Sequence, residues 1–195
     1  GVDCAVRVWD IATGEETTTF RGHEGFASFV AFTPDGKQVV SGSWDGTAKV
    51  WDVTVDHEVN MFLGQIGGIC SMAFSPDGKR LVSNSNHGKV MIWDVASCAE
   101  VMTLSGEGEE CWPRSTEFSP DGKRIVSVSR EGAIKVWDTE TGSHIMTLGG
   151  QEESVYCFAF SPDGKRIVSG SRDGKTKLWD VAKGEEIMTW AGGGH

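Results

Sequence analysis

Residues 26–62 read FASFVAFTPDGKQVVSGSWDGTAKVWDVTVDHEVNMF, and the pattern of these residues predicts a set of short strands and tight turns. Apolar alternation over 26–32 is followed by Thr33, Pro34, Asp35 and Gly36. Pro presets φ at a turn corner, Asp caps the turn through its side chain, and Gly takes the positive-φ position. Residues 37–41 complete this hairpin, a second one leads into 47–51, and another strand covers 58–62. The stretch therefore predicts four short antiparallel strands in one sheet.

The same stretch is one copy of a repeat. The dipeptide Trp-Asp starts at positions 9, 51, 93, 137 and 179, with intervals of 42, 42, 44 and 42 residues. The turn motif keeps that period, with its Phe at positions 32, 74, 118 and 160. A small sheet cannot bury both of its faces alone, so we expect consecutive copies to stack against one another.

Radial stacking of such sheets gives a β-propeller. The period, the strand number and the Trp-Asp ending resemble the WD-repeat family over essentially the whole chain. The resemblance implies an all-β fold of four full blades after a half blade, with these bounds: 1–20 for the half blade, then about 26–62, 68–104, 112–148 and 154–190. Propellers of this family usually close with about seven blades, so we expect residues 1–195 to be a segment of a larger propeller.

Composition narrows the possible partners. The formal net charge is −10, and the 18 Lys and Arg residues are scattered, which argues against binding nucleic acid. No apolar run approaches the ~20 residues that cross a bilayer, and the first residues do not form a secretory signal. The five cysteines are odd in number and have no metal-type spacing. We therefore expect the cytoplasm or another reducing intracellular compartment.

The resemblance also implies a buried hydrogen-bonded set in each blade, made by a His, a second-strand Ser or Thr, a turn Asp and the third-strand Trp. In the first full repeat these residues are His23, Ser41, Asp45 and Trp51. The last repeat retains Ser169, Asp173 and Trp179, whereas the His position is occupied in the three later repeats by Gln65, Glu107 and Gln151. His, Ser and Asp also form hydrolase triads, but we expect a structural role because the indole N–H uses the set.

In propellers that this chain resembles, partners usually bind the rim formed by the loops before the first strand and after the second. Residues at these places that belong to types enriched in binding hot spots are Trp44, Arg114, Arg130, Tyr156 and Arg172. The three arginines favour an acidic or phosphorylated peptide, because guanidinium pairs bidentately with carboxylate and phosphate. Phe26 and Trp112 have two interpretations, as rim contacts or as packing between blades.

Basic residues follow each turn motif, on what would be the opposite side: Lys37, Lys79, Arg80, Lys123, Arg124, Lys165 and Arg166. Their repetition favours a solvated face over a binding site.

These observations predict a non-catalytic scaffold that binds a protein or peptide and needs no cofactor or metal. Two alternatives remain open, an architectural subunit of a large assembly and a sensor domain of a signalling protein. A propeller-type enzyme is disfavoured, because it would need converging carboxylates, histidines or a metal at the channel. The early first-strand residues do not supply these groups; they are Ser28, Cys70, Arg114 and Tyr156.

Overall fold

The computed structural model describes residues 3–55, 57–62, 67–104, 115–129, 132–149 and 155–191. All helix or strand structure in these ranges is β, in one two-stranded and four four-stranded antiparallel sheets. The prediction of an all-β fold built from repeated four-stranded sheets is confirmed.

The sheets follow the order of the chain. Sheet A contains β1 (Val6–Trp9) and β2 (Glu16–Phe20). Sheet B contains β3 (Ala27–Phe32), β4 (Gln38–Ser43), β5 (Ala48–Asp52) and β6 (His57–Phe62). Sheet C contains β7 (Ile69–Phe74), β8 (Arg80–Ser85), β9 (Val90–Asp94) and β10 (Glu100–Leu104). Sheet D contains β11 (Thr116–Phe118), β12 (Arg124–Val128), β13 (Ile134–Asp138) and β14 (His144–Leu148). Sheet E contains β15 (Val155–Phe160), β16 (Arg166–Ser171), β17 (Thr176–Asp180) and β18 (Glu185–Trp190).

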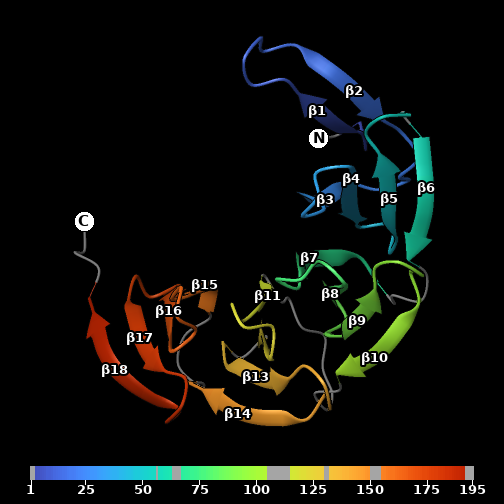
Figure 1. Ribbon diagram of the computed structural model, residues 1–195. Helices are drawn as coiled ribbons and strands as arrows, with labels where there is room; N and C mark the ends of the chain where they lie inside the picture. The colour runs from blue at the N-terminus through green and yellow to red at the C-terminus, as the bar shows by residue number, and fades with distance from the viewer. Residues whose placement is uncertain are drawn as a thin grey trace.

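Successive sheets are arranged along an arc (Figure 1). The first strand of each four-stranded sheet lies on the inner side of the arc, and the last strand lies on the outer side. The arc is open between sheet A and sheet E. Each pair of neighbouring sheets therefore forms one junction, at which the side chains of two repeats meet.

The second strands of sheets B, C and D are buried on both faces, because their alternate residues point toward different neighbours, whereas Val168 in β16 of sheet E is exposed. In β4, Val39 packs with Phe20 and Trp51 at the junction of sheets A and B. The next residue, Val40, packs at the junction of B and C with side chains such as Leu81 and Trp93. Similar clusters fill the C–D and D–E junctions. This burial explains the runs of apolar residues in the second and third strands.

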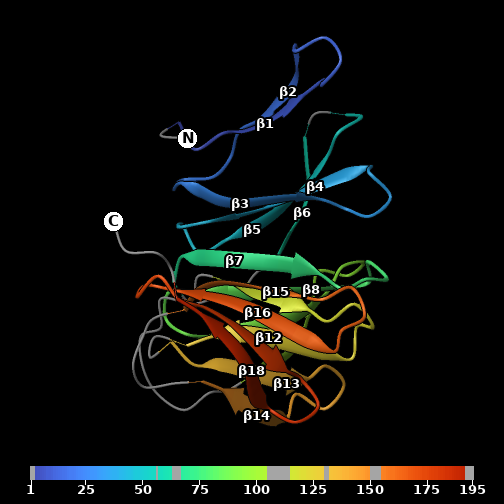
Figure 2. The ribbon, with the colours of Figure 1, turned by 90° about the vertical axis from the view of Figure 1, so that its left-hand side faces the viewer.

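The turn motif closes the hairpin between the first two strands of each full sheet. In sheet B the Thr33 hydroxyl donates to Asp35 Oδ1 at 2.6 Å, and the Lys37 amide donates to the same carboxylate at 3.1 Å. Gly36 has a φ of 71°, a left-handed conformation that favours glycine. Seen from the side, these hairpin turns lie at the right of the stacked sheets (Figure 2). We call this side the turn face and the opposite side the rim.

Candidate functional site

The structure brings His23, Ser41, Asp45 and Trp51 together at the rim end of sheet B. The Trp51 indole donates to Ser41 Oγ at 2.7 Å. His23 Nε2 lies 2.7 Å from the same oxygen, and its Nδ1 lies 2.9 Å from Asp45 Oδ2. An indole N–H can only donate, so Ser41 Oγ accepts from Trp51. All three hydrogen bonds of the set then form when the Ser41 hydroxyl donates to His23 Nε2 and His23 Nδ1–H donates to Asp45. The strand register positions the serine for this contact. Val39 pairs with Trp51, so Ser41, two residues further along β4, is a diagonal neighbour of Trp51 within reach of its indole ring.

Asp45 fixes the loop as well as the ring. Its carboxylate accepts hydrogen bonds from the Glu24 amide at 2.9 Å and the Thr47 amide at 2.8 Å. Burial alone would raise the pKa of Asp45, but the hydrogen bonds from Thr47, Glu24 and His23 outweigh it and lower the pKa to about 2. The ionised carboxylate therefore holds the segment before β3 against the β4–β5 turn.

The same geometry argues against a hydrolase triad at this place. Ser41 is 0% exposed and its oxygen already accepts the Trp51 indole. A nucleophilic hydroxyl must reach substrate, and this one is enclosed between two rings. The hydrogen bonds of the set hold the loops at the rim end of sheet B in place.

The indole-to-serine bond recurs in sheets C, D and E, at 2.7 to 2.9 Å: Trp93 to Ser83, Trp137 to Ser127, and Trp179 to Ser169. In sheet E, Asp173 accepts the Ser171 hydroxyl at 2.5 Å and pairs with Lys175 at 2.8 Å. The Lys175 and Ser171 hydrogen bonds lower the pKa of Asp173. Among the described residues, Asp173 is thus engaged within its own turn. Gln65, Glu107, and Gln151 lie outside the described residues.

An aromatic pair stands on the rim of sheet B. Phe26 and Trp44 are 45% and 59% exposed, and their rings meet edge to face with centroids 5.9 Å apart. The Trp44 amide donates to the Phe26 carbonyl at 3.0 Å. Gly68 of the next repeat packs against the Trp44 backbone, where an added Cβ would lie 3.0 Å from its Cα. The backbone is therefore fixed on both sides while the indole ring faces solvent, so of the two interpretations of Phe26 the rim contact fits its exposure.

The other predicted rim residues are only partly described. Arg172 is exposed in the β16–β17 turn, which is equivalent to the β4–β5 turn that carries Trp44. Tyr156 is half-buried in β15, at the register irregularity between Val155 and Cys157. Arg114, Arg130 and Trp112 lie outside the described residues.

The inner strands of sheets B and C carry Ser28 and Cys70 at the same irregularity. The Ser28 hydroxyl is directed to the Gly42 carbonyl and to the Ile69 carbonyl of the neighbouring sheet, so it links two repeats. Burial raises the pKa of the Cys70 thiol, which keeps it protonated near neutral pH. These groups contribute to packing at the inner side of the arc.

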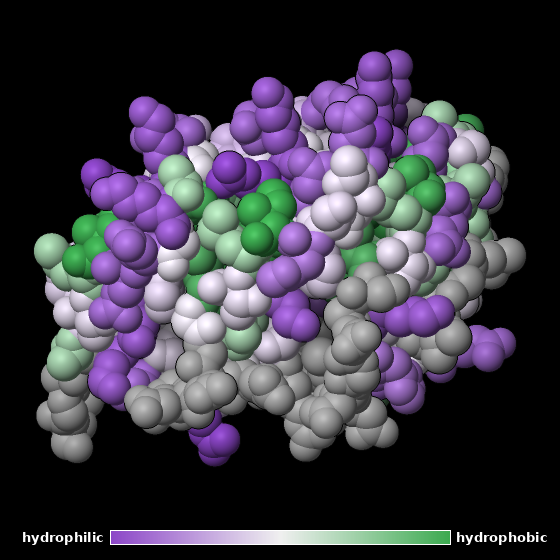
Figure 3. Space-filling model, turned by 90° about the horizontal axis from the view of Figure 1, so that it is seen from below, coloured by the Kyte–Doolittle hydropathy of each residue, from purple (hydrophilic) through white to green (hydrophobic). Residues whose placement is uncertain are grey.

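On the turn face, five of the seven basic residues that follow the turn motifs are exposed, as expected of a solvated face, whereas Arg80 and Arg124 are half-buried. Arg80 donates from Nη1 to the Thr139 carbonyl at 3.1 Å, and Arg124 donates to the Val181 carbonyl at 3.3 Å. Each arginine therefore crosses from one sheet to the next, at the C–D and D–E junctions. Hydrophilic residues cover the upper edge of the molecule seen from its outer side (Figure 3), which is the edge of the turn face. Sequence reasoning missed the two arginine contacts.

Among the described residues, no three His, Cys, Asp or Glu side chains are grouped so that they could hold a metal ion. The described residues also include no helix that is long and apolar enough to cross a membrane.

Comparison with known proteins finds the same repeat. A family model described as WD domain, G-beta repeat matches residues 14–52, 57–94, 98–138 and 142–180. The chain is 47% identical over 47 residues to a U3 snoRNP-associated protein-like protein of Arabidopsis thaliana, which is 24% of this chain and 10% of that protein. It is 46% identical over 43 residues to the periodic tryptophan protein 2 homolog of Neurospora crassa, 22% of this chain and 5% of that protein. A serine-threonine kinase receptor-associated protein of Dictyostelium discoideum is 45% identical over 47 residues, 24% of this chain and 16% of that protein. The matched part thus spans between 5% and 16% of the length of these relatives.

Proposed function

The chain belongs to the WD-repeat family, and on that premise we propose that it is a non-catalytic scaffold that binds a protein or peptide partner on its rim. The observation that carries this proposal is the Phe26–Trp44 pair. Large aromatic side chains seldom lie half exposed beside each other without a function, and Trp is the residue most enriched in binding hot spots. Because the Trp44 backbone is held by Phe26 and Gly68, little conformational entropy would be lost when a partner covers the ring.

The chemistry of the partner follows from the charged residues of the same rim. Arg172 is exposed, and Arg130 occupies the equivalent position one repeat earlier in the sequence. In the sequence of its repeat, Arg114 occupies the position that Tyr156 occupies in the last repeat. We propose that these residues select an acidic or phosphorylated segment while Trp44 contributes apolar contact. No cofactor is needed for this function, and the odd number of cysteines favours a reducing compartment.

Capture of partners from source extract on the immobilised chain tests the proposal. Trp44→Ala combined with Arg172→Glu should reduce partner recovery at least tenfold, because the aromatic anchor and a cation are both lost. The matched control is Lys123→Glu combined with Lys165→Glu, which changes charge on the turn face and should leave recovery unchanged. Equal recovery by the rim variant and the unchanged chain would overturn the proposal.

An architectural role in a large assembly is the second candidate. Apolar side chains are exposed toward both ends of the arc, among them Val30 and Phe32 in sheet B, beside the two-stranded sheet A, and Met188 and Trp190 in sheet E. The name of one relative also associates that protein with a ribonucleoprotein. Stoichiometric recovery of one large complex would favour this role, whereas substoichiometric peptides would favour the rim binder. A sensor domain of a signalling protein would be indicated by recovery with a signalling enzyme.

A further inference from the structure

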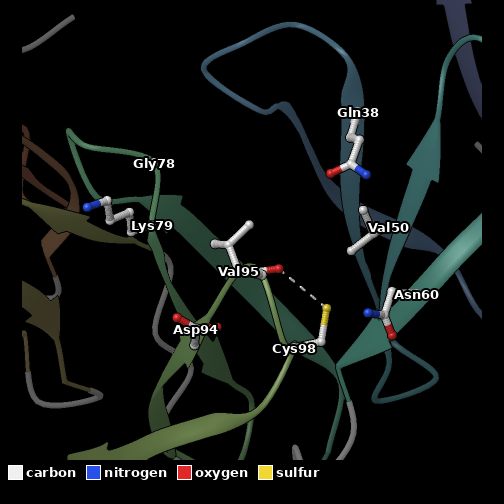
Figure 4. A pocket seen from close by; sticks show the side chains of 9 residues that line it. Gln38, Val50, Asn60, Gly78, Lys79, Asp94, Val95 and Cys98 are labelled. Atoms are coloured by element: carbon white, nitrogen blue, oxygen red, sulfur yellow. Dashed lines mark hydrogen bonds between the residues drawn. The ribbon is translucent and has the colours of Figure 1, made fainter.

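The turn face is hollowed at the junctions of sheets B and C and of sheets C and D, and the lining differs: Arg80 lines the cavity at the C–D junction, whereas no arginine is among the described residues that line the one at the B–C junction. The cavity at the B–C junction has a volume of about 540 Å³, and its lining includes Gln38, Asn60, Asp94, Val95 and Cys98 (Figure 4). Three of these residues depart from the repeat. These three residues, Gln38, Asn60 and Cys98, line the same cavity.

The first departure is the loss of an arginine. Gln38 pairs with Asp52 in the register in which Arg80 pairs with Asp94 and Arg124 pairs with Asp138. Those two arginines donate to a carbonyl directly after the Trp-Asp of the next sheet. The equivalent carbonyl at the B–C junction belongs to Val95. The Val95 carbonyl oxygen accepts a hydrogen bond from the Cys98 thiol, with 3.7 Å between the oxygen and Sγ. A thiol is a weak donor, whereas the donor at the next two junctions is a guanidinium.

The second and third departures make room beside that carbonyl. Asn60 pairs with Val50 in the register in which Met102 pairs with Ile92 and Met146 pairs with Val136. Cys98 occupies the turn position of Gly142, and an added Cβ at Gly142 would lie 2.9 Å from Met102 Sδ. With the shorter Asn60 in place of a Met, the Cys98 side chain fits, although its φ of 54° is one that glycine adopts more easily.

The lining presents acceptors to this space. The lining acceptors are the Asp94 carboxylate, the Val95 carbonyl and the side-chain amide oxygens of Gln38 and Asn60. Two of them already accept hydrogen bonds within their own strand or turn, Asp94 Oδ1 from Ser97 and Asn60 Oδ1 from the Met61 amide. In Figure 4 Gln38, Asn60 and Cys98 border the open space, and Asp94 lies on the other side of Val95. Lys79 is the one cation among the lining residues, and its amine points away from Gln38 and Asn60 (Figure 4). The net charge of −10 further favours a cationic ligand.

We propose that this cavity binds an arginine side chain supplied by a partner protein. The guanidinium donates to the Val95 carbonyl, as Arg80 and Arg124 donate to the equivalent carbonyls at the next two junctions, and it pairs with Asp94. Guanidinium suits the site better than ammonium, because its planar fork can reach a carbonyl and a carboxylate together. This site lies on the face opposite the rim and is independent of the function proposed there.

Titration of the ¹⁵N-labelled 195-residue chain with acetyl-Gly-Arg-Gly-amide tests the proposal by NMR. The peptide should shift the amide signals of Gln38, Asn60 and Val95. The citrulline peptide has the same shape without the charge, and it should bind at least tenfold more weakly. Shifts located elsewhere, or equal binding of the two peptides, would overturn the proposal.

Two variants should close the site. Gln38→Arg supplies the chain's own guanidinium, and Asn60→Met fills the inner part of the cavity with the residue of the other junctions. Each should reduce arginine-peptide affinity at least tenfold, and Asn60→Met keeps the test valid if Gln38→Arg does not fold. Cys98→Gly is the control that removes no acceptor and should retain binding. Binding by both closing variants as strong as that of the unchanged chain would contradict the proposal.

Discussion

At the residue scale, the fold depends on a few polar atoms buried between apolar strands. Ser41 is the most constrained of them, because its single hydroxyl serves both the Trp51 indole and His23. The resemblance to a known family indicated which residues meet here. It also implied that the set is buried, and Ser41 is 0% exposed in the structure.

Ser41→Ala should lower the free energy of unfolding by about 2–4 kcal/mol, because it leaves two buried ring nitrogens unpaired. Ser43→Ala is the matched change on the same strand. It removes one hydrogen bond, from the Asp45 amide at 3.1 Å, and should cost about 1 kcal/mol. Urea unfolding measures both, and equal losses would show that Ser41 does not join the two rings.

Asp45 should make the chain sensitive to acid. Its pKa is about 2 in the folded chain and about 3.9 in an unfolded one, so its contribution to stability is present above about pH 4 and is lost as the pH falls toward 2. Asp45→Asn should therefore be less stable than the unchanged chain at pH 6, with a difference that shrinks toward pH 2. A difference that does not vary with pH would contradict the ionised state described for Asp45.

Glu117 should have the opposite pH dependence. Burial raises the pKa of this carboxyl despite a hydrogen bond from the Phe160 backbone, whereas Ala31 and Ala73 hold the equivalent positions. Because the pKa of Glu117 is raised in the folded chain, the contribution of this residue to the free energy of unfolding is greatest at low pH and is lost as the pH rises through the folded pKa. Glu117→Gln keeps the acceptor and removes the charge, so it should be more stable than the unchanged chain at pH 7 and equal to it near pH 3. A variant that is less stable at pH 7 would show that the carboxylate is favourable.

At the element scale, each strand is specified by local sequence, but the contacts between sheets are not. Period-2 alternation and the turn motif predicted the strands of sheet B, and the structure has them at β3 to β6. The role of Arg80 and Arg124 was missed, because their carbonyl acceptors lie 59 and 57 residues away in the sequence. Comparing equivalent positions across repeats would have singled out Gln38, Asn60 and Cys98. That comparison would not have shown that they line one cavity.

The arginine contacts between sheets should contribute measurably to stability. Arg124→Gln should lower the free energy of unfolding by about 0.5–1.5 kcal/mol, because the Val181 carbonyl loses its donor from the neighbouring sheet. Arg166→Gln makes the same change on sheet E, where the side chain is exposed, and should stay within about 0.5 kcal/mol. Thermal unfolding followed by circular dichroism compares the two. An equal effect at both positions would mean that the contact at 124 adds nothing.

At the scale of the whole molecule, both proposed binding sites depend on the junctions between neighbouring sheets. Each sheet contacts its neighbours in the sequence, so stability is expected to be close to a sum over sheets and junctions. The rim pair is fixed by Gly68 of the next repeat, and the arginine cavity exists because two sheets meet. Sequence periodicity predicted the stacking, whereas the surface chemistry at each junction needed coordinates.

A double-mutant cycle on Phe62 and Trp93 tests the stacking of neighbouring sheets most directly. These rings belong to sheets B and C and meet with centroids 5.6 Å apart. Phe62→Leu and Trp93→Leu should be coupled by about 0.5–1.5 kcal/mol in the free energy of unfolding. Phe20→Leu with Trp93→Leu, on the non-adjacent sheets A and C, should be additive within about 0.5 kcal/mol. Additivity of the Phe62–Trp93 pair would contradict the stacked arrangement.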